Sequence, residues 1–224
     1  MTQVLPAIIP VNKEQLFEEM SKVSHFAELV QVDISDGVFT NTRTWPYNGQ
    51  DRDYFEKLKT EDEGWPKWED TDVELHLMVS NPEDVLEEWI ATGVASVVAH
   101  IEATEDFQKV IDICRDKNVS VGVAIKPNTE IEKIEKIVPQ VDFIQVMGSQ
   151  LLGKHGVELD EKSLEVIKTL RAKFPDSIIA IDIGVTEENA ETLVEAGVNK
   201  LISGGAILNS DNPKEVFKFL ESVN

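Results

Sequence analysis

The stretch VQVDISDGVF, residues 30–39, decides how the chain can fold. An apolar strand ends there in two aspartates, Asp33 and Asp36. A buried carboxylate without a partner costs several kcal/mol, so such a group must be paired, liganded or protonated. The stretch SIIAIDIGV, residues 177–185, repeats the pattern with Asp182. Two carboxylates at the ends of core strands are what a proton-transfer site requires, one as acid and one as base.

Strand and helix patterns alternate along the whole chain. Most of the strand patterns are near-continuous aliphatic or β-branched runs, as in parallel strands that are buried on both faces. Eight such strands over 224 residues predict an α/β protein with a single (β/α)8 barrel (TIM barrel) domain spanning residues 1–224. A doubly wound open sheet is the competing architecture, but its first strand usually runs into a glycine-rich turn, and Pro10 follows the first strand here. The predicted strands are 4–9, 29–33, 73–78, 96–100, 120–125, 143–147, 178–182 and 200–203.

The helix patterns between the strands carry recognisable ends. Asn81 followed by Pro82 predicts an N-cap and a first helical residue, and Gly197 lies just past a helix, where glycine is preferred. The predicted helices are 13–23, 82–92, 105–117, 129–138, 160–174, 186–196 and 213–222.

Residues 38–72 interrupt this rhythm with a long, polar segment that contains Trp45, Trp65 and Trp68. We expect an extended loop or insertion within the barrel, with a short helix near residues 51–61. Two interpretations stay open. The aromatic residues pack onto the barrel rim, or the segment is a lid or a subunit contact, because long loops of a barrel often cover its active face.

Composition narrows the classes of partner. The formal net charge of −21 opposes binding to nucleic acid and to anionic membrane surfaces. No apolar run approaches the roughly 18 residues of a membrane span, and residues 1–10 do not resemble a signal peptide. The single cysteine, Cys114, has no partner for an intrachain disulfide. We therefore expect a cytoplasmic protein that binds neither nucleic acid nor membrane.

Barrels place their catalytic groups at the C-terminal ends of the strands. Gln31 and Asp33 lie two residues apart on one strand and therefore share a face, as do His76 and Met78. An interior that offers a glutamine, two aspartates and a histidine around one point suits a metal ion. Other residues at predicted strand ends are His100, Glu102, Lys126, Met147 and the run Ser203, Gly204 and Gly205.

The order of these motifs resembles the ribulose-phosphate 3-epimerase family over nearly the whole chain. The individual motifs are short, but their order, spacing and strand-end placement together are specific. They are LPAII (5–9), VDISDG (32–37), LHLMVSNPE (75–83), AHIEAT (99–104), GVAIKPNT (122–129), IDIGV (181–185) and SGGAIL (203–208).

The resemblance implies a (β/α)8 isomerase of the pentose phosphate pathway that interconverts D-ribulose 5-phosphate and D-xylulose 5-phosphate. Asp33 and Asp182 would be the catalytic acid–base pair at C3, acting through an enediolate, and would bind a divalent metal together with His76. Met78 and Met147 would form apolar walls around the reacting carbon. The resemblance also implies a phosphate site on glycines, and a homo-oligomer is compatible with it. The glycines are Gly153, Gly156, Gly184, Gly204 and Gly205.

Several positions depart from the family pattern. Gln31 stands where the family has a metal-binding histidine, Ile183 where it has a glycine, and Lys126 where it has an asparagine. The family's phosphate loop reads LGKHGV here (152–157), with two of its glycines kept. Two accounts follow. In the first, Gln31, Asp33, His76 and Asp182 hold a divalent metal (Zn, Fe(II), Mn or Mg) in an oxygen-rich site that favours Mn, Fe(II) or Mg. In the second, the metal is lost and Lys126 supplies positive charge.

Two alternative functions remain open at this point. One is an isomerase or lyase on another sugar phosphate, with Lys126 as electrophile or Schiff-base amine. The other is a non-catalytic barrel that binds a phosphorylated ligand. The survival of both aspartates favours the epimerase, because a site without activity has no need to keep two charges at the ends of core strands.

Overall fold

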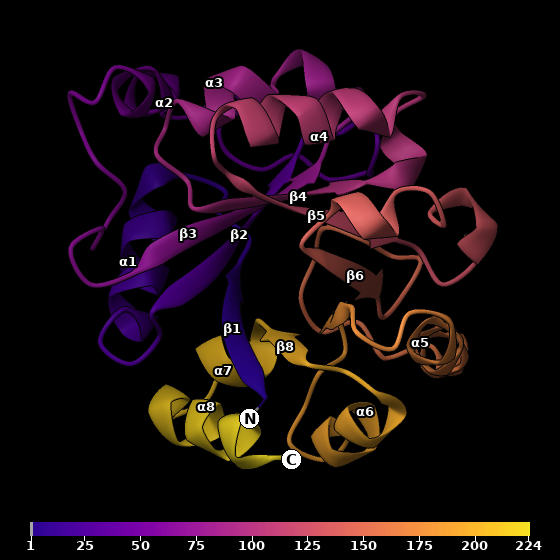
Figure 1. Ribbon diagram of the computed structural model, residues 1–224. Coiled ribbons are helices and arrows are strands. Elements are labelled where there is room, and N and C mark those ends of the chain that lie inside the picture. Colours follow the sequence, from indigo (N-terminus) through magenta and orange to yellow (C-terminus); the bar gives the residue numbers. More distant parts are fainter. Residues whose placement is uncertain (1) are drawn as a thin grey trace.

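Eight near-continuous apolar runs form the parallel strands of one closed barrel in which β8 also pairs with β1. The computed structural model describes residues 2–224, and Figure 1 shows its strands ringed by helices. The closed order confirms the predicted (β/α)8 barrel and rules out the doubly wound sheet. The strands are β1 (Gln3–Ile8), β2 (Leu29–Ser35), β3 (Asp72–Met78), β4 (Ser96–His100), β5 (Ser120–Ile125), β6 (Phe143–Met147), β7 (Ile178–Asp182) and β8 (Lys200–Ser203).

The helices form where apolar residues recur every three or four positions. In α1 this spacing buries Leu16, Met20 and Val23 against the barrel, and the Asn12 side chain caps the helix by accepting from the Gln15 N–H. The α-helices are α1 (Lys13–Val23), α2 (Arg52–Lys59), α3 (Leu86–Ile90), α4 (Phe107–Asp116), α5 (Glu161–Lys173), α6 (Ala190–Ala196), α7 (Gly205–Leu208) and α8 (Pro213–Ser222). The 3-10 turns are η1 (Pro82–Asp84), η2 (Ile101–Ala103), η3 (Ile131–Lys133) and η4 (Val138–Gln140).

Two helix predictions were wrong in detail. The helix expected over 129–138 is replaced by the short turns η3 and η4, with Pro139 inside η4. Asn81 is not a side-chain cap: it adopts a left-handed conformation, and its N–H donates to the Ala103 carbonyl. The helix expected over 82–92 is correspondingly split into η1 and the short α3.

The connection between β2 and β3 contains α2, close to the predicted position. Its aromatic residues pack inward: Trp45 lies 6.1 Å from Trp89 of α3 between ring centroids, and the Trp65 indole donates to the Thr92 carbonyl. Trp68, in contrast, is 65% exposed. Trp45 and Trp65 thus pack against α3 and the residues that follow it, and the two interpretations of residues 38–72 remain predictions.

Two separate apolar layers stabilise the barrel. The larger lies between the strands and the surrounding helices, and the smaller fills the barrel interior around Leu5, Val98, Phe143 and Ile202. The interior also contains buried polar side chains, which are the chemically informative ones. They are Gln31, Asp33, Glu74, His76, His100, Gln145, Asp182 and Lys200.

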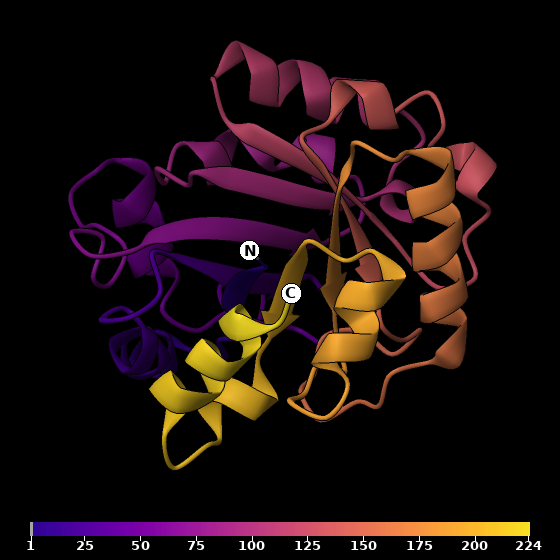
Figure 2. The same ribbon diagram turned by 60° about the horizontal axis from the view of Figure 1, so that its bottom comes forward.

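The first and last parts of the chain lie side by side at the N-terminal ends of the barrel strands, as both ribbon views show (Figures 1 and 2). The Thr2 hydroxyl donates to the Val223 carbonyl at 2.7 Å, close to where β1 pairs with β8. Across residues 2–224, none of the helices has the length and apolar character needed to traverse a lipid bilayer.

Candidate active site

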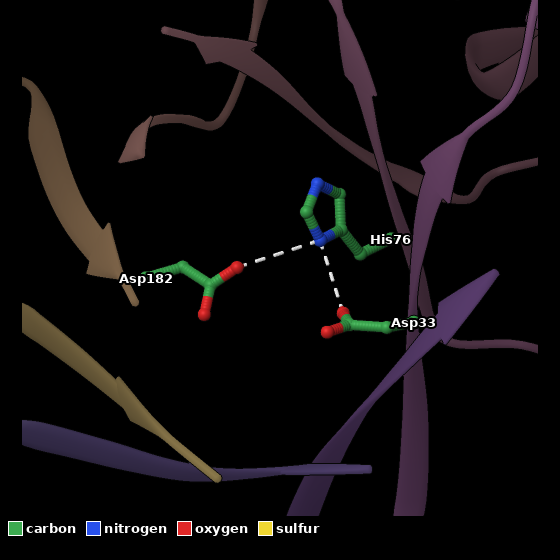
Figure 3. A group of neighbouring side chains, drawn as sticks. All are labelled: Asp33, His76 and Asp182. Carbon is green, nitrogen blue, oxygen red and sulfur yellow. Dashed lines mark hydrogen bonds and ion pairs between the residues drawn. The ribbon is translucent and has the colours of Figure 1, made fainter. Parts of the chain in front are cut away.

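Asp33, His76 and Asp182 converge at the C-terminal end of the barrel. His76 Nδ1 lies 3.0 Å from Asp33 Oδ1 and 3.6 Å from Asp182 Oδ2 (Figure 3). All three are buried, and one potential ligand atom from each lies within 4.8 Å of the others. The group could therefore hold a metal ion, as the sequence predicted.

Strand register explains this convergence. Asp33 on β2 pairs directly with His76 on β3, and Asp182 is the last residue of β7, where it pairs with Met147. Inward-facing residues at the same height of a closed barrel point at one another across its interior. The backbone of three strands therefore fixes the group.

Gln31 lies beside the group and fits a metal site. Its Nε2 donates to Asp33 Oδ1 at 3.0 Å and lies 3.5 Å from His76 Nδ1. Its Oε1 is buried without a hydrogen-bond partner anywhere in residues 2–224. A half-turn of the amide would direct this oxygen at the group, so that two carboxylates, an imidazole and an amide oxygen could surround a divalent cation.

The electrostatics of the group favour one retained proton. Burial and the neighbouring charge of Asp33 raise the pKa of Asp182 to about 7. Burial alone would lower the pKa of His76, but its hydrogen bond with Asp33 and the charges of Asp33 and Asp182 outweigh burial and raise it. The buried acids and imidazole therefore share a proton near neutral pH.

A cavity of about 220 Å³ opens beside the two aspartates. Asp33, Asp182, Met78 and Met147 line it, whereas Gln31 and His76 lie behind its wall. All five glycines predicted to bind phosphate also line it: Gly153, Gly156, Gly184, Gly204 and Gly205.

The loop that follows β6 brings His155 onto this glycine-rich wall. A Cβ atom at Gly204 would lie 2.2 Å from His155 Cε1, so only glycine permits this close approach. Sequence reasoning left the position of His155 open, because a loop residue carries no periodic pattern.

Ile183, directly after Asp182, has a φ of +80°. This left-handed conformation is strained for a β-branched residue and is natural for glycine. The family glycine at this position therefore has a physical reason, and the chain retains the backbone geometry without the residue that suits it. Strain of this kind is typical of functional sites.

Lys126 does not line the cavity. Its Nζ lies 4.2 Å from the centre of the Phe39 ring, and its backbone N–H donates to Glu102 Oε1 at 2.8 Å. The amine is engaged in a cation–π contact rather than directed at the aspartates.

The structure adds contacts that strand-end positions alone did not predict. His100 contacts His76, with 3.0 Å between their Nε2 atoms. Gln145 lies 3.5 Å from Asp182 Oδ2. Gln145 stands two residues before Met147 on β6 and thus on the same face, a spacing that could have identified it.

A closed eight-stranded barrel with two carboxylates and an imidazole at the C-terminal ends of its strands defines a (β/α)8 barrel of the enzyme type. A family model described as "Ribulose-phosphate 3 epimerase family" matches residues 3–208. The chain belongs to that family, as the motifs indicated.

Curated relatives agree with this assignment. The chain is 30% identical over 149 residues to ribulose-phosphate 3-epimerase of Schizosaccharomyces pombe, a match that covers 66% of this chain and 65% of the relative, slightly under two thirds of its length. It is 24% identical over 222 residues to the Bacillus subtilis protein of the same name, covering 96% of each.

Solved structures share the fold at lower identity. A 3-hexulose-6-phosphate synthase covers the whole chain with a TM-score of 0.69 and 15% identity. A mutant tryptophan synthase alpha-subunit from Pyrococcus furiosus has a TM-score of 0.70 and 16% identity, covering 100% of this chain and 99% of that one. At these identities the likeness concerns the fold alone.

Proposed function

We propose that the protein is an epimerase that interconverts D-ribulose 5-phosphate and D-xylulose 5-phosphate. The observation that carries the proposal is that Asp33 and Asp182 come from two separate strands, β2 and β7, which have β1 and β8 between them, and line one cavity. Inversion at a carbon requires a base on one face and an acid on the other, and two separate carboxylates meet that requirement. Family membership supplies the substrate class.

In this mechanism one aspartate removes the C3 proton of the ketose phosphate to give an enediolate. The other aspartate returns a proton to the opposite face, and the two roles exchange in the reverse direction. The raised pKa of Asp182 leaves one proton on the pair near neutral pH, which is the protonation state that such an exchange requires. Met78 and Met147 would shield the reacting carbon from water.

Asp33, His76 and Asp182, with Gln31 after rotation of its amide, would hold a divalent cation. Such an ion, when bound, would supply positive charge opposite the oxygens on which negative charge develops. The predominance of oxygen donors favours Mn, Fe(II) or Mg over Zn.

We assign the phosphate to the glycine-rich wall of the cavity. Backbone N–H groups near Gly184, Gly204 and Gly205 would bind its oxygens. Lys154, which also lines the cavity, would add positive charge in a chain of net charge −21, and the His155 ring could donate a hydrogen bond. The pentose phosphate pathway, a cytoplasmic location and a homo-oligomer remain expectations.

The decisive experiment is proton NMR of D-ribulose 5-phosphate with the purified protein in D2O, after chelation and after addition of Mn, Fe(II), Mg or Zn. We expect deuterium to enter C3 as xylulose 5-phosphate forms, and Asp33→Asn to abolish both. Asp112→Asn is the matched control, because Asp112 is exposed on α4 and does not line the cavity. No exchange by the folded wild type under any of these conditions would contradict the proposal.

A further inference from the structure

A chain of hydrogen bonds lies behind His76 on the side away from the aspartates. His76 Nε2 is 3.0 Å from His100 Nε2, and His100 Nδ1 is 3.1 Å from Glu102 Oε2. Figure 3 shows the second ring nitrogen of His76 pointing away from both carboxylates. Both histidines are fully buried, and their rings meet edge to edge, with centroids 5.2 Å apart and planes inclined by 27°. The proposed mechanism uses neither His100 nor Glu102.

The positions of the protons in this chain follow from its two ends. An ionised carboxylate only accepts hydrogen bonds, so His100 Nδ1 carries the hydrogen that Glu102 receives. Full burial disfavours a charged His100 ring, and a neutral ring with its hydrogen on Nδ1 has its lone pair on Nε2. His76 Nε2 must then carry the hydrogen in the contact between the two rings, because two lone pairs at 3.0 Å would repel.

The second oxygen of the Glu102 carboxylate also accepts hydrogen bonds. Oε1 accepts from the Lys126 N–H at 2.8 Å and from the Thr129 hydroxyl. Burial opposes ionisation of Glu102, but these bonds and the bond from His100 lower its pKa to about 2. Both carboxylate oxygens are thus committed to donors, a role that an amide side chain cannot fill.

We propose that Glu102 and His100 are positioning residues that fix His76 in the tautomer with hydrogen on Nε2. His76 Nδ1, which faces Asp33 and Asp182, then carries the lone pair that a divalent cation requires. The inference extends the metal site of the proposed function to residues that do not contact the metal.

The first test is the nitrogen NMR spectrum of protein labelled with 15N-histidine. We call the hydrogen-bonded chain Glu102–His100–His76 the relay. The protein has four histidines, and the variants His25→Gln and His155→Gln assign the signals of the two that lie outside it. The spectrum is recorded with Zn²⁺ bound, because without a cation the Asp33 carboxylate, 3.0 Å from His76 Nδ1, would draw the hydrogen to that nitrogen. The wild type should then show the hydrogen of His76 on Nε2 and that of His100 on Nδ1. Hydrogen on His100 Nε2 would overturn the proposal, and this measurement needs no variant of Glu102 or His100.

The second test is Glu102→Gln. The amide oxygen should stay with the Lys126 N–H, so the amide NH2 faces His100 Nδ1 and forces it to accept. Hydrogen then moves to His100 Nε2, where it opposes the hydrogen on His76 Nε2, and this shift is visible in the same spectrum. An unchanged His100 tautomer in the folded variant would contradict the proposal.

The third test is calorimetric titration with Zn²⁺ in the absence of substrate. Loss of such supporting contacts typically weakens metal binding by roughly 10–100-fold, so Glu102→Gln should raise Kd by that factor. Glu83→Gln is the matched control: Glu83 is also half-buried and accepts from Thr104, but it lies outside the relay, and it should change Kd less than about twofold. Equal affinity of Glu102→Gln and wild type would contradict the proposal.

These readouts separate the two proposals. If ribulose 5-phosphate shows no exchange while the tautomer and the zinc affinity respond as stated, the epimerase assignment fails and the positioning role stands. If exchange occurs but Glu102→Gln changes neither tautomer nor affinity, the positioning role fails alone.

Discussion

The two ends of the barrel interior treat buried charge in opposite ways. At the N-terminal end, Glu74 Oε2 accepts from Lys200 Nζ at 2.6 Å and from Ser96 Oγ at 2.8 Å. At the C-terminal end, Asp33 and Asp182 face a single imidazole and no lysine or arginine. Both ends have a hollow, of about 590 and 220 Å³ respectively, so the larger hollow is not the one that contains the two aspartates.

The difference in how the carboxylates are neutralised indicates which end of the barrel can carry out proton transfer. A carboxylate neutralised by a lysine has a fixed charge and a structural role, whereas two carboxylates that share a proton can exchange it. Strand β3 contributes to both ends, since Glu74 and His76 are two residues apart on one inward face.

The largest expected effect on stability is at the N-terminal end. Lys200→Met removes the only cation that pairs with Glu74 among the described residues, and breaking a buried pair costs about 3–5 kcal/mol of unfolding free energy. Urea unfolding at neutral pH measures it. The double variant Glu74→Gln with Lys200→Met should recover most of the loss, and a cost below about 1 kcal/mol for Lys200→Met alone would contradict the prediction.

The next effect is a pH dependence at the C-terminal end. The pKa of Asp182 is about 7 in the fold against an ordinary 3.8, so the folded state binds a proton more tightly than the unfolded state. The stabilisation from this protonated group is complete below about pH 4 and is lost as pH rises towards 7. In metal-free protein, Asp182→Asn should therefore become more stable than wild type by on the order of 3 kcal/mol between about pH 5 and about pH 8.

Urea unfolding in chelator at the two pH values measures this difference. Added Mn²⁺ should reverse the order, because only the wild type retains the carboxylate ligand. The same stability difference at both pH values would argue against a shared proton.

Gln31→His should strengthen zinc binding at the same end. Imidazole is a better zinc ligand than an amide, so Kd for Zn²⁺ should fall at least roughly tenfold, or about 1.4 kcal/mol. Calorimetry measures it, with Gln140→His as the control, since Gln140 is exposed on η4. Equal zinc affinity of Gln31→His and wild type would place Gln31 outside the metal site.

The smallest effect concerns strain beside Asp182. Ile183→Gly and Ile183→Ala both remove the apolar side chain, but only glycine is comfortable at a φ of +80°. Glycine should therefore be more stable than alanine here by about 1 kcal/mol. At Ile181, which lies inside β7, the alanine variant should instead be more stable than the glycine variant. Thermal unfolding of the four variants decides, and alanine proving the more stable at both positions would remove the argument for strain.

The sequence predicted most of the barrel, because strands buried on both faces leave continuous apolar runs. The strands at 96–100, 120–125, 143–147, 178–182 and 200–203 have the predicted bounds. Short helices were harder to predict from the sequence. Helix α7, for example, spans only Gly205–Leu208, too few residues to show a helical period.

The candidate site was predictable only in part. Asp33, His76 and Asp182 stand out because a charge at the end of an apolar run is unusual, and the family resemblance grouped them. The contact of His76 with His100, and the pairing of Glu74 with Lys200 across 126 residues, depend on how strands are staggered around the barrel. Nothing local in the sequence reports that stagger.

The pairing of β1 with β8 also means that the barrel can close only when nearly the whole chain has been synthesised. About 200 residues of chain separate these strands, and ribosomes add roughly 5–20 residues per second. After β1 leaves the ribosome, roughly 10–40 s pass before its last neighbour exists. During that interval β1 presents an unpaired edge, which invites association between nascent chains. The net charge of −21 repels one such chain from another, so the acidity of the surface protects the barrel while it is still open.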